Sequence, residues 1–464
     1  MGTPAQFDHD VFRILLYRND ATEILLEINS DGLRIPSVLV PAHSRIAEEI
    51  TAAIRSGWNL QTVYLFTLPL DGLSHDPIHY QVVESCRLEP TPPAGMQWHP
   101  VLSLSVDNLQ DPEDSAAIQN SLTTLDRYQR GELPGVFGKT GWLRMVTEWV
   151  EAQAATAGLR LTGEFRQLNA SPTFNLTRFE TDGPTLWFKA VGEPNLHEYR
   201  VTLKLASLFP GFLPQILGTR LEWNAWLALA AEGCQLDANS ANNAWAAAAE
   251  NLALLQISSF GRRFELIQAG CKDLRPCSLM NLVDLFLDAM TELMERQTKP
   301  SPAPLSRKEL FSLGRDISSA LQQIGECAIP NTLGHLDMNP GNVLVCGTHC
   351  TFLDWAEAYI GPPFFSFQYL LEHFRRIQGG HWQKEKSLVA SYARHWTRFA
   401  SAREINAAFR LMPLLAAFAY GVGIGSWRNR ESFQPQSARH LRSLTRRMKC
   451  EADSLQERRL TCVP

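Results

Sequence analysis

Short segments of alternating apolar and polar residues dominate the first part of the chain. They have the two-residue period of half-buried β-strands and lie at residues 11–17, 23–28, 36–41, 62–68, 78–85 and 101–106. One stretch, 44–57, has a helical period instead, because Ile46, Ile50 and Ile54 recur every four residues and share one helix face. The pattern therefore predicts a compact α+β domain over residues 1–127.

The pattern changes twice further along the chain. Residues 128–142 contain several glycines and no apolar period, which favours a linker. A helix at 141–158 is followed by strand-like runs at 161–168, 173–181 and 185–191, then by a helix at 195–209 and strands at 214–219 and 224–230. We therefore expect a small β-rich lobe over residues 143–235. From 236 to 464 the helical period prevails, which predicts a larger helical lobe.

Composition narrows the class of protein. The chain has 464 residues, of which 45% are hydrophobic and 20% charged, and this excludes a disordered protein, a collagen-like fibre and a small disulfide scaffold. The net charge of −5 gives no basic field, so we expect no nucleic-acid partner. The nine cysteines show no framework of paired spacings, and the N-terminus has no signal-peptide pattern. Both observations indicate a cytoplasmic protein. The longest apolar run, Leu411 to Gly425, is short for a membrane span and fits a buried helix.

The sharpest chemical signal lies in residues 333–345, LGHLDMNPGNVLV. Here His335, Asp337 and Asn342 form the pattern H-x-D-x-x-x-x-N, and Asp354 follows at the end of the next strand. The segment reads as a loop between a helix and a β-hairpin, which is the one interruption of the helical lobe. Such a loop can bring two acids and an amide to one cleft.

These residue types suit phosphoryl transfer, which needs positioning and charge neutralisation more than covalent chemistry. Asp337 suits the carboxylate that orients the attacking hydroxyl and accepts its proton. Asn342 and Asp354 supply oxygen ligands for Mg²⁺ on the phosphates. We expect His335 to brace the loop. The alternative is that Asp337 and Asn342 only occupy turn positions and that His335 is a core residue.

A second signal is a lysine inside an apolar strand. Lys189 lies in LWFKAV, where an unpaired ammonium group would cost several kcal/mol unless the strand is an edge. Glu198 follows in the first turn of the next helix and could hold Lys189 toward nucleotide phosphates. Glu193 competes for the lysine. The alternative is that Lys189 extends from an edge strand and Glu198 only favours the helix N-terminus.

Taken in order, these features resemble the aminoglycoside phosphotransferase and choline kinase group of the protein-kinase-like superfamily. The resemblance covers residues 160–425 and leaves the N-terminal 140 residues outside it. It implies a two-lobed kinase-like α+β fold, ATP and Mg²⁺ as cofactors, and transfer of the γ-phosphoryl group to a hydroxyl of a small molecule. It also implies that Asp337 is the catalytic base, Asn342 and Asp354 are the metal ligands, and Lys189, held by Glu198, contacts phosphate.

The chain departs from this group in the loop between the first two strands of the lobe. That loop reads LNASPTFNL, without the glycines that let a backbone approach phosphate, so Ser171 and nearby amides are the expected contacts. By the order of elements, the adenine hinge falls near Glu232. The sequence also leaves a competing interpretation open: a kinase-like protein that has lost turnover and acts as a nucleotide sensor or scaffold.

The acceptor leaves only weak signals. Aromatic residues of the helical lobe could line a pocket, although core packing is their commoner fate; they are Tyr359, Phe364, Phe365 and Trp382. Glu357 and Glu372 could attract a cationic acceptor, or they could belong to solvated helix faces. A third interpretation makes the N-terminal domain a second enzyme that acts on nucleotides.

Overall fold

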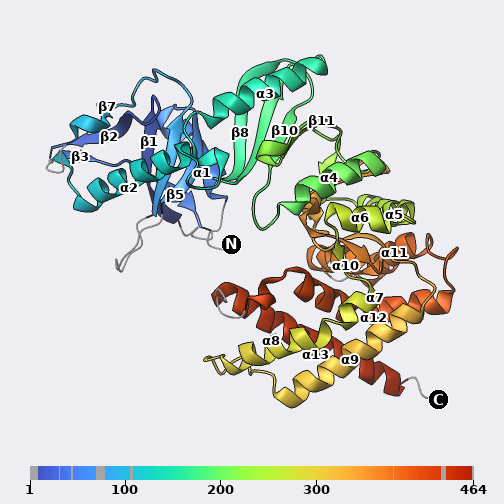
Figure 1. Cartoon of the computed structure of the whole chain (residues 1–464). Helices are drawn as coiled ribbons and strands as arrows, with labels where there is room; N and C mark the ends of the chain where they lie inside the picture. Colours follow the sequence, from blue (N-terminus) through green and yellow to red (C-terminus); the bar gives the residue numbers. More distant parts are fainter. Residues whose placement is uncertain are drawn as a thin grey trace, which may run out of the picture. The chain divides into compact units, whose positions relative to one another are not determined.

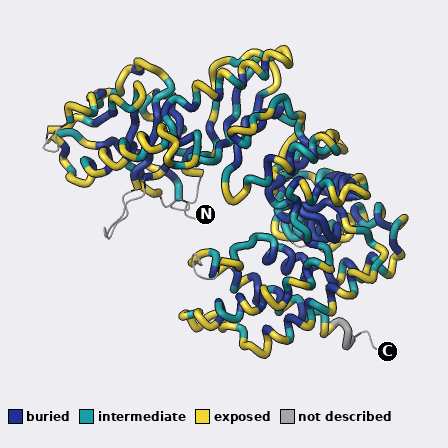
Figure 2. Tube along the Cα trace, viewed as in Figure 1, coloured by how far each residue is buried: buried dark blue, intermediate teal, exposed yellow. Residues whose placement is uncertain are grey.

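The computed structural model describes residues 9–30, 32–42, 45–68, 79–104, 108–379, 381–429 and 435–461 (Figure 1). The chain divides into two compact units. The first consists of Met1–Tyr199 with Gln215–Ala230, and the second of Arg200–Pro214 with Ala231–Pro464. Each unit has its own cluster of buried apolar residues (Figure 2).

The first unit begins with a seven-stranded mixed sheet. Its order is β3-β2-β1-β6-β5, with β4 paired to β1 and β7 paired to β2, and β1 and β6 run parallel. The strands are β1 (His9–Arg18), β2 (Glu23–Asn29), β3 (Gly32–Arg34), β4 (Ser37–Pro41), β5 (Thr62–Leu68), β6 (His79–Ser85) and β7 (Met96–Pro100). Its helices are α1 (Ile46–Trp58) and α2 (Pro112–Gln129). The predicted α+β character of this region is therefore present.

Two details of this region differ from expectation. The strand predicted at 101–106 is absent at its start, where residues 101–103 form a turn of 3-10 helix and Leu102 is fully exposed; residues 105 and 106 lie outside the described residues. Alternation of apolar residues over a few positions is therefore a weak signal for a strand. On α1, Ile50 and Ile54 are buried, but Ile46 at the helix start is 40% exposed.

The second sheet of this unit is antiparallel and has the order β11-β12-β10-β9-β8. Its strands are β8 (Leu161–Ser171), β9 (Phe174–Thr181), β10 (Leu186–Ala190), β11 (Ile216–Arg220) and β12 (Ala225–Leu229), close to where the periodicity predicts them. In β10 the residues Leu186, Phe188 and Ala190 are buried, so the strand period directs Lys189 to the opposite face.

The two sheets share one apolar core. Helix α3 (Trp142–Thr156) contributes Trp142, Val146 and Val150 to it, beside strand residues from both sheets. Phe137, from the segment expected to be a linker, is also buried and lies edge-on to Trp142 and Phe188, with ring centroids 5.4 and 6.0 Å apart. The boundaries expected at residues 127, 142 and 235 stay predictions.

The second unit is mainly helical. Helix α4 (His197–Leu208) carries the chain into it. The further helices are α5 (Asn242–Ser258), α6 (Arg263–Ala269), α7 (Pro276–Met280), α8 (Val283–Glu295), α9 (Arg307–Glu326), α10 (Phe364–Gln378), α11 (Trp382–Ala393), α12 (Ala402–Gly423) and α13 (Pro435–Thr461).

This unit contains more strand than expected. The predicted hairpin is present as β16 (Val343–Cys346) and β17 (His349–Phe352), and β13 (Cys234–Gln235) extends it. A second small sheet has the order β14-β18-β15 and is formed by Lys272–Asp273, Ala358–Gly361 and Thr332–His335. Strands of two to four residues have no alternation that a sequence pattern could reveal, and β15 and β18 are buried along their whole length.

The long apolar run lies in α12, whose 22 residues include Pro413. Within the described part of the chain, this helix is the one that is long and apolar enough to cross a membrane by length and composition. Of its most apolar window, 67% is buried inside the protein. Its packing is that of a core helix.

Candidate active site

A buried histidine organises the loop that carries the predicted catalytic residues. Strand β15 ends at His335, whose ring is inaccessible to solvent. Its Nδ1 accepts a hydrogen bond from the Asp337 backbone N–H at 3.0 Å, so Nε2 carries the proton and donates to the Leu353 carbonyl at 3.0 Å. Burial lowers the pKa of His335, and the neutral ring can make both bonds. The expected brace is present.

Asp337 lies beside two amide side chains. Asn342 Nδ2 donates to the Asp337 carbonyl at 3.0 Å and to its carboxylate Oδ2 at 3.3 Å. Asn339 Nδ2 donates to the other carboxylate oxygen at 3.1 Å. Both oxygens are thus oriented by protein donors. Sequence reasoning identified Asp337 and Asn342 but missed Asn339, for which the only signal is an amide two residues after the acid.

Asp354 follows β17 and is held near the same loop by the backbone. The Leu353 N–H donates to the Asn342 carbonyl at 2.9 Å, while the Leu353 carbonyl receives the His335 bond. Asp354 itself has a left-handed backbone with φ of 62° and an exposed side chain. A non-glycine residue in this region is uncommon and often marks a functional position.

The donor set fits Mg²⁺ in chemical type. Because the Asn342 amide nitrogen is directed to Asp337, its carbonyl oxygen is the atom that can ligate a cation. With the Asp354 carboxylate it offers two oxygen ligands, and magnesium commonly takes one or two carboxylates plus phosphates and water. Within the described residues there is no cluster of three or more His, Cys, Asp or Glu side chains that could hold a metal ion without a substrate.

The strand lysine is paired with the helix glutamate. Lys189 Nζ lies 2.5 Å from Glu198 Oε1, with side chains that are 14% and 2% exposed. The Lys189 ammonium also lies 5.7 Å from the centre of the Trp226 ring on the neighbouring strand. The ion pair is the expected one, and it gives both buried groups a partner of opposite charge.

The two weaker nucleotide-site candidates have other contacts. Ser171 ends β8, and its Oγ accepts hydrogen bonds from the backbone N–H groups of Thr173 and Phe174 at 3.4 and 3.1 Å. Both amides therefore already have an acceptor within the turn. Glu232 is exposed and lies 3.9 Å from the Cys346 sulfur, just past the point where the chain enters the second unit.

A half-buried polar group on α10 lies near Asp337. Tyr369, Glu372 and His373 share one helix face through their three- and four-residue spacing. Burial is the main cause that raises the pKa of Tyr369 and lowers that of His373, and the negative charge of Asp337 affects both. Tyr420 of α12 stacks at an angle on Tyr369, with ring centroids 5.5 Å apart.

Both acidic candidates for cation recognition are already paired. Glu372 is bound to Arg447 and lies 3.5 Å from Arg376. Glu357 is paired with Lys272. The aromatic candidates also change: Tyr359, Phe364 and Phe365 are buried in the core, and Trp382 is 67% exposed. Tyr369 and Tyr420 are half-buried tyrosines whose pKa values the charge of Asp337 helps to raise, and sequence reasoning missed them.

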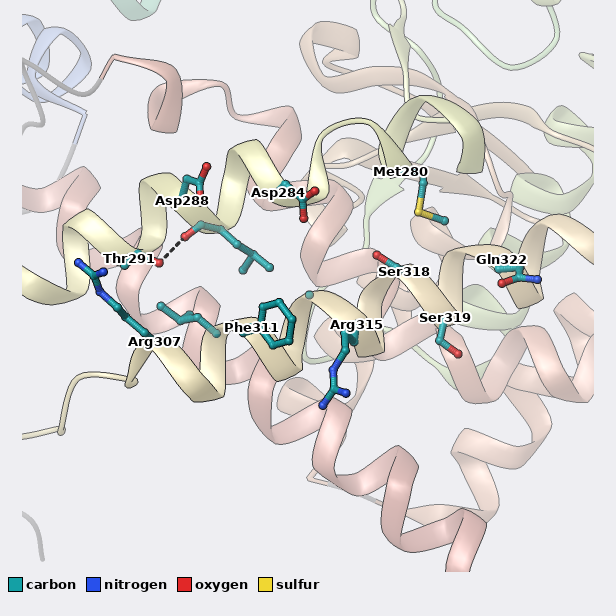
Figure 3. Close-up of a pocket in the computed structure, with 13 residues that line it drawn as sticks. Met280, Asp284, Asp288, Thr291, Arg307, Phe311, Arg315, Ser318, Ser319 and Gln322 are labelled. Atoms are coloured by element: carbon teal, nitrogen blue, oxygen red, sulfur yellow. Dashed lines mark hydrogen bonds between the residues drawn. The ribbon is translucent and has the colours of Figure 1, made fainter.

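A cavity lies elsewhere in the second unit. It has a volume of about 700 Å³ and opens between α8 and α9, where Asp284, Asp288, Arg307 and Arg315 line it (Figure 3). None of the residues predicted to act in catalysis lines this cavity. Its mouth includes Phe311, which is 71% exposed.

A comparison with protein families supports the class of protein expected from this loop, a phosphotransferase. Residues 221–404 match the sequence profile of the phosphotransferase enzyme family, APH. The predicted resemblance is therefore confirmed, and the matched stretch includes His335, Asp337, Asn342 and Asp354. A comparison with curated proteins gives no match.

Solved structures of the same class are similar to the chain. Macrolide 2'-phosphotransferase MphH from Brachybacterium faecium aligns with 64% of this chain and 97% of its own, at 16% identity and a TM-score of 0.41. Choline kinase LicA from Streptococcus pneumoniae aligns with 66% and 99%, at 13% identity and a TM-score of 0.43. An APH(2") enzyme in complex with GDP and kanamycin aligns with 68% and 100%, at 16% identity and a TM-score of 0.42. The α+β character expected from the sequence is present in the strands and helices of the chain itself.

Proposed function

We propose that the protein is an ATP- and Mg²⁺-dependent phosphotransferase that moves the γ-phosphoryl group to a hydroxyl of a small molecule in the cytoplasm. The observation that carries this proposal is the Asp337 carboxylate, oriented by Asn339 and Asn342 on a loop that a neutral His335 holds. A carboxylate fixed by two donors is positioned rather than mobile. Positioning is what phosphoryl transfer asks of a protein.

In the proposed reaction the acceptor hydroxyl attacks the γ-phosphorus and ADP leaves. Asp337 accepts a hydrogen bond from that hydroxyl and takes its proton as the new P–O bond forms. Asn342 and Asp354 would hold Mg²⁺, which neutralises charge on the phosphate oxygens. Lys189, fixed by Glu198, contacts the phosphates together with Ser171 and nearby amides, while the backbone near Glu232 contacts adenine.

The paired carboxylates near Asp337 support a neutral acceptor. A carboxylate that already binds a guanidinium or an ammonium group attracts a further cation only weakly, and Arg447, Arg376 and Lys272 would repel it. The flat faces of Tyr369 and Tyr420 suit an apolar or ring-containing alcohol. We therefore propose an uncharged, hydroxylated acceptor and not a polycationic one.

An acceptor screen tests this function. Purified protein with ATP and Mg²⁺ is given neutral sugars and nucleosides in parallel with the amine-bearing macrolides, aminoglycosides and amino alcohols, and ADP release is measured. We expect a neutral hydroxyl compound to accelerate ADP release and chelation of Mg²⁺ to abolish it. Preferred turnover of a polycationic acceptor would contradict the proposed acceptor class but not phosphoryl transfer.

One observation favours a second candidate, a nucleotide sensor or scaffold without turnover. The Ser171 hydroxyl occupies two amides of the β8–β9 turn, so fewer donors remain for phosphate. If this candidate holds, ATP raises the melting temperature of the protein while no acceptor releases ADP above the rate without acceptor.

A further inference from the structure

A buried glutamine ties the second sheet of the first unit to the first sheet. Gln167 on β8 is 1% exposed, and its side-chain amide bonds both backbone groups of Tyr64 on β5. The Tyr64 N–H donates to Gln167 Oε1 at 2.8 Å, and Gln167 Nε2 donates to the Tyr64 carbonyl at 3.2 Å. The pairing of β5 with β6 shifts register between Tyr64 and Phe66. A bulge of this kind leaves backbone groups for Gln167 to satisfy.

Charged residues of α1 bind the same strand. Glu48 on α1 lies 2.5 Å from Arg166 of β8, and Arg55 lies 2.6 Å from Glu164. Exposed ion pairs contribute little energy, but these two fix the register of α1 against β8. Glu48 therefore belongs to a contact between α1 and β8.

The segment between α2 and α3 contacts the turn that joins β8 to β9. The Phe137 N–H donates to the Pro172 carbonyl at 3.1 Å. Gly135, with φ of 122°, approaches so closely that an added Cβ would lie 2.3 Å from the Pro172 oxygen. On the other side of the turn, a Cβ at Gly192 would lie 2.5 Å from the Thr173 side chain. The turn is enclosed on two sides, and only glycine permits either approach.

We propose that the N-terminal region supports the nucleotide-binding sheet and that residues Gly135–Phe137 hold the β8–β9 turn in one conformation. We call these three residues the clamp. This inference rests on the proposed function, because the turn is the one expected to contact nucleotide phosphates. In a glycine-rich loop the backbone is mobile and closes over its ligand. Here the turn has no glycine, and its shape is set by the clamp before nucleotide arrives. Gly135 and Phe137 are thus positioning residues for the nucleotide, outside the matched family region.

The test uses the full-length protein and the substitution Gly135→Ala. Hydrogen–deuterium exchange of peptides spanning residues 165–178 reports the conformation of the turn, and steady-state kinetics reports KM for ATP and kcat. We expect Gly135→Ala to accelerate exchange at Thr173 and Phe174 at least tenfold. We also expect it to raise KM for ATP about fivefold while kcat changes less than twofold, because the clamp acts on nucleotide positioning and not on Asp337.

Gly131→Ala is the matched control. Gly131 also has a positive φ, 73°, but an added Cβ there would meet no atom within 4 Å. This variant also places a Cβ at a positive φ but does not touch Pro172, so its exchange and KM should equal those of the unmodified protein. If Gly135→Ala fails to fold, Phe137→Leu replaces it, since the smaller side chain loses the ring contacts with Trp142 and Phe188.

The results separate the clamp from the proposed reaction. Unchanged exchange at the turn in folded Gly135→Ala, or in Phe137→Leu where that variant replaces it, overturns the clamp. Equal effects in Gly131→Ala also overturn it. If the unmodified protein shows no ATP turnover, the proposed function fails, while the exchange measurement still decides whether the N-terminal region fixes the turn. Faster exchange together with an unchanged KM overturns the role of the clamp in nucleotide binding.

Discussion

At the scale of single residues, the site could be predicted where its signal is local in sequence. Asp337 and Asn342 lie five residues apart in one loop, and the structure places their side chains in direct contact. Tyr369 and Tyr420 could not be predicted, because their contact depends on how α10 packs on α12. Asn339 could not be predicted for a different reason. An asparagine in a turn is common, and only the folded loop brings its amide to the Asp337 carboxylate.

The ion pair of Lys189 gives a prediction at this scale. Glu198→Gln removes the charge that fixes the ammonium group, and hydrogen bonds to charged groups contribute roughly 1.5–3 kcal/mol. If Lys189 contacts phosphate, we expect KM for ATP to rise at least tenfold in steady-state kinetics, with a smaller change in kcat. Glu193→Gln is the control, because Glu193 is exposed and lies close in sequence. An equal rise in both variants would show that the pair has no specific role.

At the scale of elements, most strands and helices of the β-rich lobe lie where periodicity predicts them. The pattern works there because β9 and β10 are long enough to alternate and end in a defined turn, in which the Gly183 N–H donates to Thr181 Oγ1 at 2.9 Å. It fails for β14 and β15, which are short and satisfy their backbone only through partners far away in sequence. Strand β15 of this small sheet ends at His335, so the sheet that the sequence did not predict is part of the site.

The junction of β6 with α3 gives a pH-dependent prediction. Both Glu84 carboxylate oxygens lie 2.9 Å from the Gly141 nitrogen at the start of α3. Burial raises the pKa of Glu84 to about 7, against the usual value of 4.5. Between these values the unfolded chain loses the proton first, so the folded state loses stability as pH rises from 4.5 to 7.

Glu84→Gln should remove this loss. We expect the free energy of unfolding of the unmodified protein to fall by about 3 kcal/mol relative to the variant as pH rises across that interval. Chemical denaturation of both proteins at several pH values measures the difference. A constant difference from pH 4.5 to 7 would mean that Glu84 does not titrate in this way.

At the scale of the whole molecule, the main surprise is how the N-terminal region is built into the first unit. Its sheet and the sheet that carries Lys189 share one apolar core, and Gln167 and Tyr64, which join them, are 103 residues apart in sequence. A contact of that separation leaves no trace in local periodicity. The glycines of residues 128–142 predicted a linker, and at one of them, Gly135, an added Cβ would lie 2.3 Å from the Pro172 oxygen.

The central claim is that Asp337 activates a hydroxyl for transfer of a phosphoryl group from ATP. Phosphorus-31 NMR tests it most directly, since it distinguishes a phosphate monoester from inorganic phosphate. With Mg²⁺ and an acceptor from the screen, we predict a new monoester resonance that grows with ADP. With Asp337→Asn we predict a rate lower by about 10²–10⁴. ADP accompanied only by inorganic phosphate, or an unchanged monoester rate in Asp337→Asn, would contradict the account.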